Sequence, residues 1–501
     1  MVYESEIIAM VNVELCIRYS QYGAVGDGVT NDIDAIIETH AVANEKGLKV
    51  CADPGAVYYI SEIKDKMADI QTNTDWSGAR FIIDDSNVSV HEREKHIFCV
   101  SSKLLPINVT IVHSLKKYQK KIELTLPYNC LVSVVDESTM HYIRHGLNQD
   151  NGSPQTDIFV LDKEGAVDVN TPIIWDFDNI TSMTAFPIEA ESLTITGGHF
   201  TTIANRAESK YTYYSRGIKI TRSNVHVSGL RHDIIGELDH GAPYRGFMSV
   251  HQCANVTIQD CQFSAHKTYS TIGSANAPVN MGTYDLDVYS SVSVTFKDCS
   301  QLNDIHDTKL WGIFGSNLSK NLIFDTVSFS RFDAHMGVVG ATIKNSTLGY
   351  MGINLIGSGL FLLENTHIHS GSMINLRQDY GSTWQGDIII RDCIFTPQNG
   401  AKSDTVLISG QNLGHHDFGY ICYMPSKITI EGLTIQDGNP VDDYTGPKIF
   451  GTFNQHYTGV EEHPYVITNE VIIKNIKTQS RKKYVISNNS AMFKNVTVRE
   501  E

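Results

Sequence analysis

Acidic residues and histidines cluster in two segments, each of which follows a short apolar run. Asp304 and Asp307 lie in the first segment, and Asp333 and His335 lie in the second. Two carboxyl groups on either side of a glycosidic bond can hydrolyse it, one as an acid and the other as a base or nucleophile. Neighbouring carboxyl groups also raise the pKa of one of them, as a general acid requires. We therefore predict Asp307 and Asp333 as the catalytic pair, Asp304 as a third candidate, and His335 as the group that orients water or a sugar hydroxyl.

Other polar and aromatic residues have the chemistry of sugar contacts. Arg377 and Asp379 shortly precede Trp384. An ion pair beside aromatic rings suits a sugar, because the rings stack on its apolar side and the charged groups bind its hydroxyls. His266 follows an earlier copy of the same apolar run. We assign all four residues to substrate binding.

Two polar segments supply the remaining substrate-binding candidates. The first, HDIIGELDHGAPYRG, contains Glu237, and long polar loops with glycine are often functional. The second precedes Val294 and contains Tyr284, Asp285 and Asp287, which we expect in a loop. A purely structural alternative stays open, because Asp is common at the corners of β-solenoids, where it accepts backbone hydrogen bonds.

A repeated phrase must position these residues. VTFKDCSQ, LIFDTVSF, ATIKNSTL and FLLENTHI begin at residues 294, 322, 341 and 361, so the spacings are 28, 19 and 20 residues. About 20 residues fits one coil of a β-solenoid and is too short for a propeller blade, and the leucine consensus of leucine-rich repeats is absent. We predict an all-β, right-handed parallel β-helix. Because coils stack about 4.8 Å apart, equivalent positions form ladders, and the acids above should share one corner.

Composition narrows the possible functions. The net charge of −16 argues against nucleic-acid binding, which depends on Lys and Arg. No apolar run approaches about 18 residues, so we expect no transmembrane helix. The first residues lack the features of a secretory signal, which predicts a cytoplasmic or virion-associated protein. Cys261, Cys299 and Cys393 occupy one repeat position and predict a buried, reduced stack. The sequence contains no CxxC pair, so we expect no zinc site of the CxxC type. We also expect no cofactor.

The segment YGAVGDGVTNDIDAI, from Tyr22 to Ile36, begins the folded region. We expect Asn31 to cap a helix that Gly47 ends. This segment and the following VCADPGAVY resemble the start of the pectate-lyase-like β-helix superfamily, which includes phage tailspikes and glycan-degrading enzymes. The resemblance implies a helix that covers the open end of the solenoid and an oligo- or polysaccharide as the binding partner. Trimers are frequent among similar spikes, so a homotrimer is a further expectation.

The repeat phrase divides the chain into four parts. It is absent between Lys103 and Pro187, where the alternation indicates an ordinary small sheet. We predict a leader at 1–21, the cap and first coils at 22–102, an inserted β-subdomain at 103–187, and the main β-helix at 188–501.

These features together favour a glycoside hydrolase. The polygalacturonase patterns of this superfamily are absent from the expected strands. The alternatives are a calcium-assisted polysaccharide lyase, in which Asp304, Asp307 and Asp333 would bind the metal and Arg377 would be the base, an epimerase, and a non-catalytic, tailspike-like glycan-binding protein.

Overall fold

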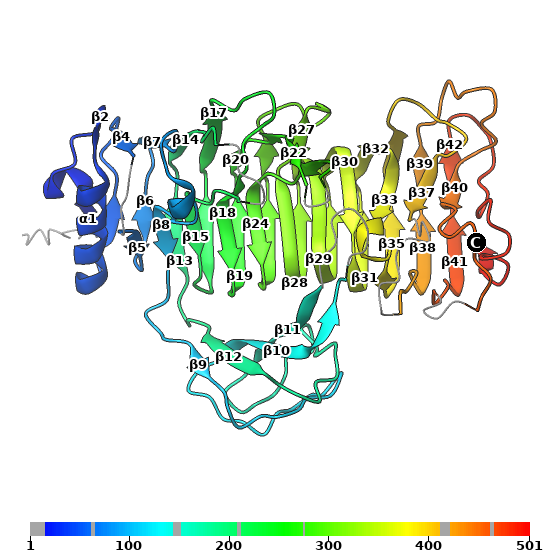
Figure 1. Cartoon of the computed structure of the whole chain (residues 1–501), viewed down its shortest axis with the longest axis horizontal. Coiled ribbons are helices and arrows are strands. Elements are labelled where there is room, and N and C mark those ends of the chain that lie inside the picture. Colours follow the sequence, from blue (N-terminus) through cyan, green and yellow to red (C-terminus); the bar gives the residue numbers. More distant parts are fainter. Residues whose placement is uncertain are drawn as a thin grey trace, which may run out of the picture.

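The computed structural model describes residues 16–61, 66–143, 152–207, 212–273, 276–410, 421–460 and 465–501, so residues 1–15 of the predicted leader lie outside the described residues. The chain winds into a long parallel β-helix with one helix at its N-terminal end and a smaller sheet at its side (Figure 1). No helix in the described ranges could span a membrane.

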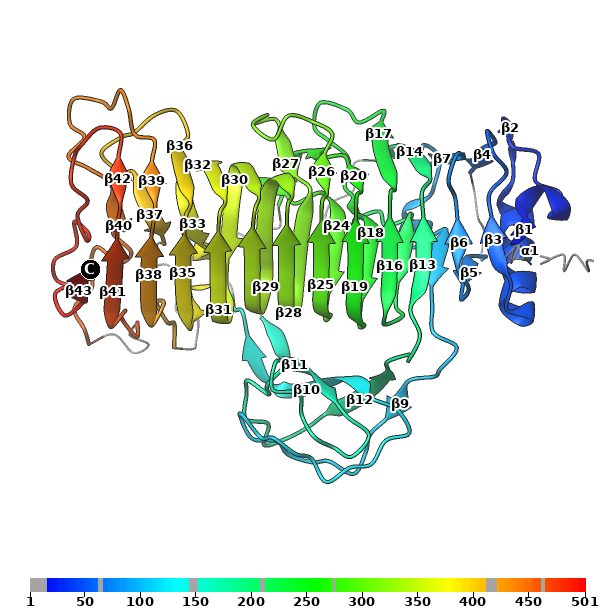
Figure 2. The ribbon, with the colours of Figure 1, turned by 180° about the vertical axis from the view of Figure 1, so that it is seen from behind.

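Each coil contributes strands to three faces, and Figure 2 shows the first of them toward the viewer. Face 1 contains β1 (Cys16–Arg18), β3 (Lys49–Cys51), β6 (Thr74–Asp75), β13 (Leu193–Thr196), β16 (Val225–Ser228), β19 (Ala254–Gln259), β25 (Val292–Lys297), β35 (Asp387–Arg391), β38 (Lys427–Glu431), β41 (Glu470–Lys474) and β43 (Thr497–Glu500). Face 2 contains β2 (Asp27–Asn31), β4 (Val57–Ile60), β7 (Arg80–Asp84), β14 (His199–Ile203), β17 (Arg231–Ile235), β20 (Gln262–Phe263), β26 (Ser300–Gln301), β32 (His367–Ser370), β36 (Ile394–Pro397), β39 (Thr434–Ile435) and β42 (Lys477–Thr478).

Face 3 completes each coil and carries most of the residues discussed below. It contains β5 (Ala68–Ile70), β8 (Phe98–Val100), β15 (Ile218–Ile220), β18 (Arg245–His251), β24 (Tyr284–Tyr289), β33 (Ser372–Leu376), β37 (Val406–Ser409) and β40 (Lys448–Phe450). In the middle of the solenoid, longer strands turn corners and belong to more than one face: β28 (Phe314–Asp325), β29 (Ser328–Lys344), β30 (Thr347–Leu355) and β31 (Gly357–Glu364).

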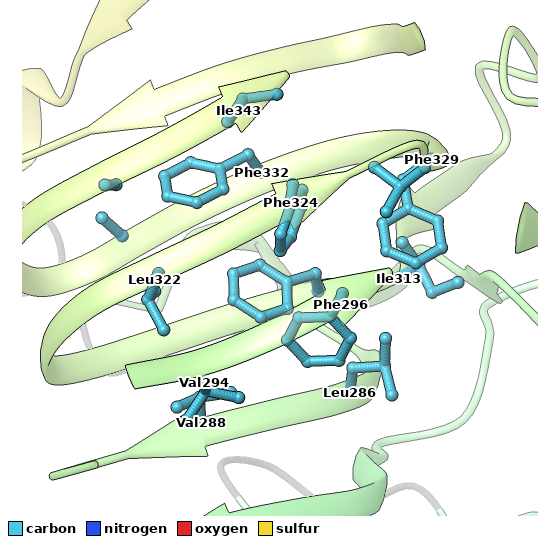
Figure 3. Close-up of a cluster of buried hydrophobic side chains, with 14 of the residues drawn as sticks. Leu286, Val288, Val294, Phe296, Ile313, Leu322, Phe324, Phe329, Phe332 and Ile343 are labelled. Carbon is cyan, nitrogen blue, oxygen red and sulfur yellow. The ribbon is translucent and has the colours of Figure 1, made fainter. Parts of the chain in front are cut away.

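The repeat phrase forms a strand of face 1, a corner and a strand of face 2. Its alternating apolar residues point inward, because successive side chains of a strand face opposite sides. Phe296, Phe324 and Phe329 meet inside the solenoid, with ring centroids 5.4 to 6.5 Å apart (Figure 3). Cys261, Cys299 and Cys393 are buried free cysteines, as predicted.

The corner of the phrase requires a left-handed backbone. Asn345 and Asn365 stand there with φ values of 53° and 43°, which Asn tolerates better than most residues. The Asn365 side chain donates to Asn345 Oδ1 over 2.9 Å, so the corner residues of successive coils also bond to one another. The polar corner in the sequence therefore reflects backbone geometry and has no need of a functional explanation.

Helix α1 (Ile33–Lys46) packs Ile33, Ile36 and Ala43 into the apolar core at the end of the solenoid. Gly47 ends the helix with φ 66°, as predicted. The predicted cap was wrong by one residue. Asp32 holds the N-cap position, and its carboxylate accepts hydrogen bonds from the backbone N–H groups of Val25 and Gly26, which closes the glycine-rich loop instead of capping the helix.

A four-stranded antiparallel sheet lies beside the solenoid, in the order β11 (Ser153–Leu161), β10 (Cys130–His141), β12 (Ser182–Pro187) and β9 (Ile107–Asn108). It packs on the corner between faces 3 and 1. Leu131 and Ile158 contact Ala254 and Val292 there. Lys320 of the solenoid donates to Asp157 over 2.7 Å, with both side chains buried. The four-part division of the chain remains a prediction.

Candidate functional site

The outward side of face 3 carries a ladder of polar residues. Asp287 of β24 pairs in register with Gly315 of β28, and Asp333 of β29 pairs with Asn354, which pairs with Asn375. The amide of Asn375 donates to Asn354 over 2.9 Å. Functional side chains from segments far apart in sequence are thus aligned by coil stacking on this face.

Asp333 is the centre of a buried ion cluster. Its neighbours Phe332 and Ala334 point into the core, so its own side chain points outward, yet it is fully covered. Arg331 donates to Oδ2 over 2.5 Å and Arg377 donates to Oδ1 over 2.6 Å. The Tyr284 hydroxyl donates to Oδ2 over 2.8 Å. We call these four residues, Asp333, Arg331, Arg377 and Tyr284, the Asp333 cluster.

The Asp333 cluster fixes the charges of its members. Burial would raise the pKa of Asp333, but the guanidinium groups of Arg331 and Arg377 outweigh it and hold that pKa well below its usual range. Of the two roles predicted for the pair Asp307 and Asp333, acid and base or nucleophile, an ionised Asp333 does not suit that of the acid. Burial likewise opposes the charge of Arg377, but Asp333 and Asp379 raise its pKa well above its usual value. Arg377 therefore does not suit the role of a base in a lyase.

A glycine lets Tyr284 reach the cluster. Tyr284 stands on β24 and crosses the neighbouring rung of β28 to bond Asp333. A Cβ atom at Gly315, on that rung, would lie 3.0 Å from the Tyr284 ring. A side chain at position 315 would therefore displace the ring from the carboxylate.

Partly exposed groups surround the cluster. Asp379 lies in the 3-10 turn η3 (Gln378–Tyr380) and accepts two hydrogen bonds from Arg377, of 3.0 and 2.7 Å. Its side chain is 34% exposed. The half-buried His335 bonds the Tyr380 hydroxyl over 3.1 Å. Tyr142 of the side sheet packs edge-on against Tyr380, with ring centroids 6.1 Å apart. The solenoid and the side sheet therefore meet at the rim of the Asp333 cluster.

The other two predicted acids lie in a different setting. Asp304 and Asp307 belong to the loop between β26 and β28, where each carboxylate accepts a backbone N–H two residues further on, over 2.9 Å. Asp304 is exposed and Asp307 is half-buried. The prediction that these residues share one corner with Asp333 was wrong, because Asp333 lies within strand β29 on face 3.

Trp384 was also wrongly placed. It lies in β34 (Trp384–Gln385) with no exposed surface and packs against Phe361 in the apolar core, with ring centroids 6.0 Å apart. It therefore offers no surface on which a sugar could stack.

His266 and Glu237 belong to a second buried cluster, centred on Asp285. His232 and His266 bond the Asp285 carboxylate over 2.7 and 3.0 Å. Glu237 Oε1 lies 3.6 Å from the other nitrogen of His266. We call these four residues the Asp285 cluster. Burial opposes the charge of His266, but the carboxylates of Asp285 and Glu237 raise its pKa to about 9.

One residue beside this site was not predicted from the sequence, and another was predicted in the wrong setting. Arg331 completes the Asp333 cluster, and its guanidinium lies 4.7 Å from the centroid of the Trp311 ring. Asp287 was expected in a loop but stands on β24, where His251 and Arg245 approach its carboxylate to 3.0 and 3.4 Å. The sequence does carry a signal for this strand, because polar and apolar residues alternate in YDLDVY, a pattern typical of a strand with polar residues on one side.

Comparisons with known proteins bear on the fold. No protein-family model matches the sequence, and no curated protein matches it. The tailspike of Pseudomonas phage phi297 superposes with a TM-score of 0.53 at 12% identity, covering 96% of this chain and 83% of that one. The tailspike of Pseudomonas phage LKA1 gives 0.50 at 12% identity, covering 92% and 81%.

A third similar structure is the tailspike of Acinetobacter baumannii bacteriophage AP22, solved in complex with a capsular saccharide. It gives a TM-score of 0.51 at 9% identity and covers 96% of this chain and 79% of that one. These similarities confirm the predicted right-handed parallel β-helix. At this level of identity they show the fold alone.

Proposed function

We propose that the protein binds an oligo- or polysaccharide on the outward side of face 3 and hydrolyses it there. The observation that carries this proposal is the Asp333 cluster with its rim. The ion pair between Arg377 and Asp379 reaches the surface and presents fixed hydrogen-bond donors beside fixed acceptors. Sugar hydroxyls need both, and the half-buried ring of Trp311 lies beside Arg331 in the same region.

Asp333 positions this surface and does not perform the chemistry. Because both of its oxygens already accept hydrogen bonds from charged partners, it holds Arg331 and Arg377 in place. The carboxylate of Asp379 is partly exposed at the rim of the Asp333 cluster, and that of Asp307 is half-buried in the loop after β26. We propose these two as the acid and base or nucleophile, and His335 as a contact to the sugar.

Binding without cleavage is the second candidate function. Two buried carboxylates of face 3, Asp287 and Asp333, have pKa values lowered by cationic neighbours that outweigh the effect of burial. Neither can donate a proton to a leaving group at neutral pH. The AP22 tailspike, crystallised with a capsular saccharide, shows that a protein of this fold binds such a ligand. The shared fold also supports virion association, one of the two predicted locations. The homotrimer stays a prediction, which analytical sedimentation can check.

The two functions separate in one experiment. The protein is incubated with a panel of bacterial capsular and O-antigen polysaccharides, and both retention on the immobilised polysaccharide and release of reducing ends are measured. A hydrolase releases reducing ends, and Asp379→Asn or Asp307→Asn lowers the rate by about 100-fold or more while binding persists. Asp387→Asn, an exposed carboxylate on face 1, is the matched control.

Each other result has a definite meaning. Retention without reducing ends identifies a binding protein, and products that absorb as unsaturated uronates identify a lyase. If no polysaccharide is retained, or if Arg377→Ala leaves retention unchanged, the proposed site is wrong.

A further inference from the structure

Face 3 carries a second set of charged side chains, on the strands that precede β28. β15, β18 and β24 lie side by side there (Figure 1), and Lys219, Ser249 and Asp287 pair in register across them. His251 stands two residues after Ser249 on the same side of β18, and Arg245 reaches the Asp287 carboxylate from the start of that strand. Because neighbouring strands are about 4.8 Å apart, three basic side chains share a small area of the outward side of face 3.

The Lys219 ammonium makes no hydrogen bond or ion pair in the part of the chain that the structure describes. Its side chain is half-buried, but the ammonium itself is not. Asp69, the outward carboxylate two strands before it, accepts a hydrogen bond from Ser101 instead. On face 1, by contrast, Arg391 and Lys427 pair with carboxylates of neighbouring coils over 2.9 and 3.2 Å. A negatively charged ligand on face 3 can therefore pair with Lys219 without displacing a protein group.

Arg245 and His251 are held in place by the buried Asp287, yet part of each side chain faces solvent. Their side chains are 41% and 23% exposed. The Arg245 guanidinium also lies over the Tyr289 ring, 5.9 Å from its centroid. A guanidinium group has five N–H donors, so its contact with one carboxylate leaves donors for a ligand. The orientation of Arg245 is thus fixed before a ligand binds.

The buried His96 shows that these cations act on the same region. Burial is the main cause of its lowered pKa, about 3, and Lys219 and His251 lower that pKa in the same direction. Both residues therefore lie close enough to His96 to oppose a positive charge there. The chain as a whole carries a net charge of −16, so this part of face 3 is a local exception.

The charges define the class of ligand. One free ammonium and one partly exposed guanidinium match a single negative charge. A carboxylate carries one such charge, whereas a phosphate monoester carries about 1.5–2 near neutral pH and would meet stronger repulsion from Asp287. We propose that Lys219, Arg245 and His251 bind the carboxylate of an acidic sugar unit.

This inference rests on the proposed function, because it names the class of polysaccharide that face 3 binds. Only β28 separates Asp287 on β24 from Asp333 on β29. A sugar chain that lies along face 3 across the strands can therefore contact both Lys219 and the rim of the Asp333 cluster.

Removing the charge from the ligand tests the inference. The probes are the uronate-containing polysaccharides of the panel, each compared with its carboxyl-reduced form, in which carbodiimide activation and borohydride reduction have converted every carboxylate into a primary alcohol. We expect the acidic form to bind the full chain about tenfold or more tightly than the reduced form, the size expected for a hydrogen bond between charged groups. Lys219→Met should remove this difference by weakening binding of the acidic form alone.

Matched variants locate the effect. Lys297→Met removes the same charge from an exposed lysine of face 1 and should leave binding of both forms unchanged. Arg377→Ala, in the Asp333 cluster, should weaken both forms alike. Lys219 has no partner in the described chain, so its replacement breaks no contact of the fold.

The remaining outcomes separate this inference from the proposed function. Retention of neutral polysaccharides alone, equal binding of the acidic and reduced forms, or equal losses from Lys219→Met and Lys297→Met would each overturn the acidic-sugar site and leave the proposed function standing. Retention of no polysaccharide at all would overturn both.

Discussion

Asp285 and Asp333 are both fully buried carboxylates on strands of face 3, but different types of side chain hold them. Asp285 on β24 is held by His232 and His266, whereas Asp333 on β29 is held by Arg331 and Arg377. Arginine stays charged at every pH that a protein survives, and histidine does not. The Asp333 cluster is therefore a permanent scaffold, whereas the Asp285 cluster depends on pH.

The position of each cluster fits its chemistry. The members of the Asp285 cluster are nine-tenths or more buried. The Asp333 cluster reaches the surface through Asp379, so its fixed charges can serve a ligand. A binding surface that must keep its shape across conditions is better built on arginine than on histidine.

The largest expected loss of unfolding free energy follows from disrupting the Asp333 cluster. Asp333→Asn leaves Arg331 buried without its charge partner and deprives Arg377 of one of two. Removing one member of a buried ion pair typically costs about 3–5 kcal/mol of unfolding free energy. Urea denaturation of Asp333→Asn and of the wild type measures this loss.

Asp387→Asn is the control for this change, since it removes an exposed carboxylate of face 1. A loss for Asp333→Asn no larger than the control would show that the two arginines find other partners. The cluster would then not be a scaffold.

A smaller effect should follow from titrating the Asp285 cluster. The pKa of His266 is about 9 in the folded protein, against 6.5 for an unperturbed histidine. Below pH 6.5 the residue is protonated in both states and its stabilisation is fully present, and the stabilisation is lost as pH rises through 9. The unfolding free energy should fall by up to about 3 kcal/mol over this interval, since one unit of pKa corresponds to about 1.4 kcal/mol.

His266→Gln should flatten this pH dependence, because glutamine keeps a donor but carries no charge. His306→Gln, at an exposed histidine, should retain it. The measurement is urea denaturation of the three proteins between pH 6 and pH 9. Parallel curves for wild type and His266→Gln would place the pH dependence elsewhere and remove the contrast between the clusters.

The fold was predictable because the chain repeats it. The alternating phrase, its Asn or Asp corner and the glycine-rich start each have a local physical cause, so one copy identifies the others. The register of face 3 was not predictable, because the connection from face 2 varies. After β26 a loop carrying Asp304 and Asp307 precedes β28, whereas β29 runs from face 2 to face 3 without a loop. Counting residues from the phrase therefore placed Asp333 in the wrong part of its coil.

Part of the site could still have been found in the sequence. Arg377 and Asp379 were identified from their spacing, and the structure joins them in one ion pair. Arg331 stands two residues before Asp333, a spacing that puts both side chains on the same side of a strand. Recognising SRFDAH as a strand would have linked them. The sequence did not reveal which of the predicted side chains are buried. Trp384 and His266 are buried because segments distant in the chain cover them.

Tyr284→Phe should give the smallest loss of unfolding free energy. It tests how much Tyr284, the uncharged member of the Asp333 cluster, contributes to the stability of the cluster. The change deletes one hydroxyl that donates to Asp333 over 2.8 Å, while both arginines remain. A hydrogen bond to a charged group contributes about 1.5–3 kcal/mol, and we expect the lower end of that range because Arg331 still bonds the same oxygen. Urea denaturation of this variant is compared with that of Tyr289→Phe, a half-buried tyrosine of the same strand. If Tyr284→Phe were as destabilising as Asp333→Asn, Tyr284 and not the arginine pair would be the principal support of the carboxylate.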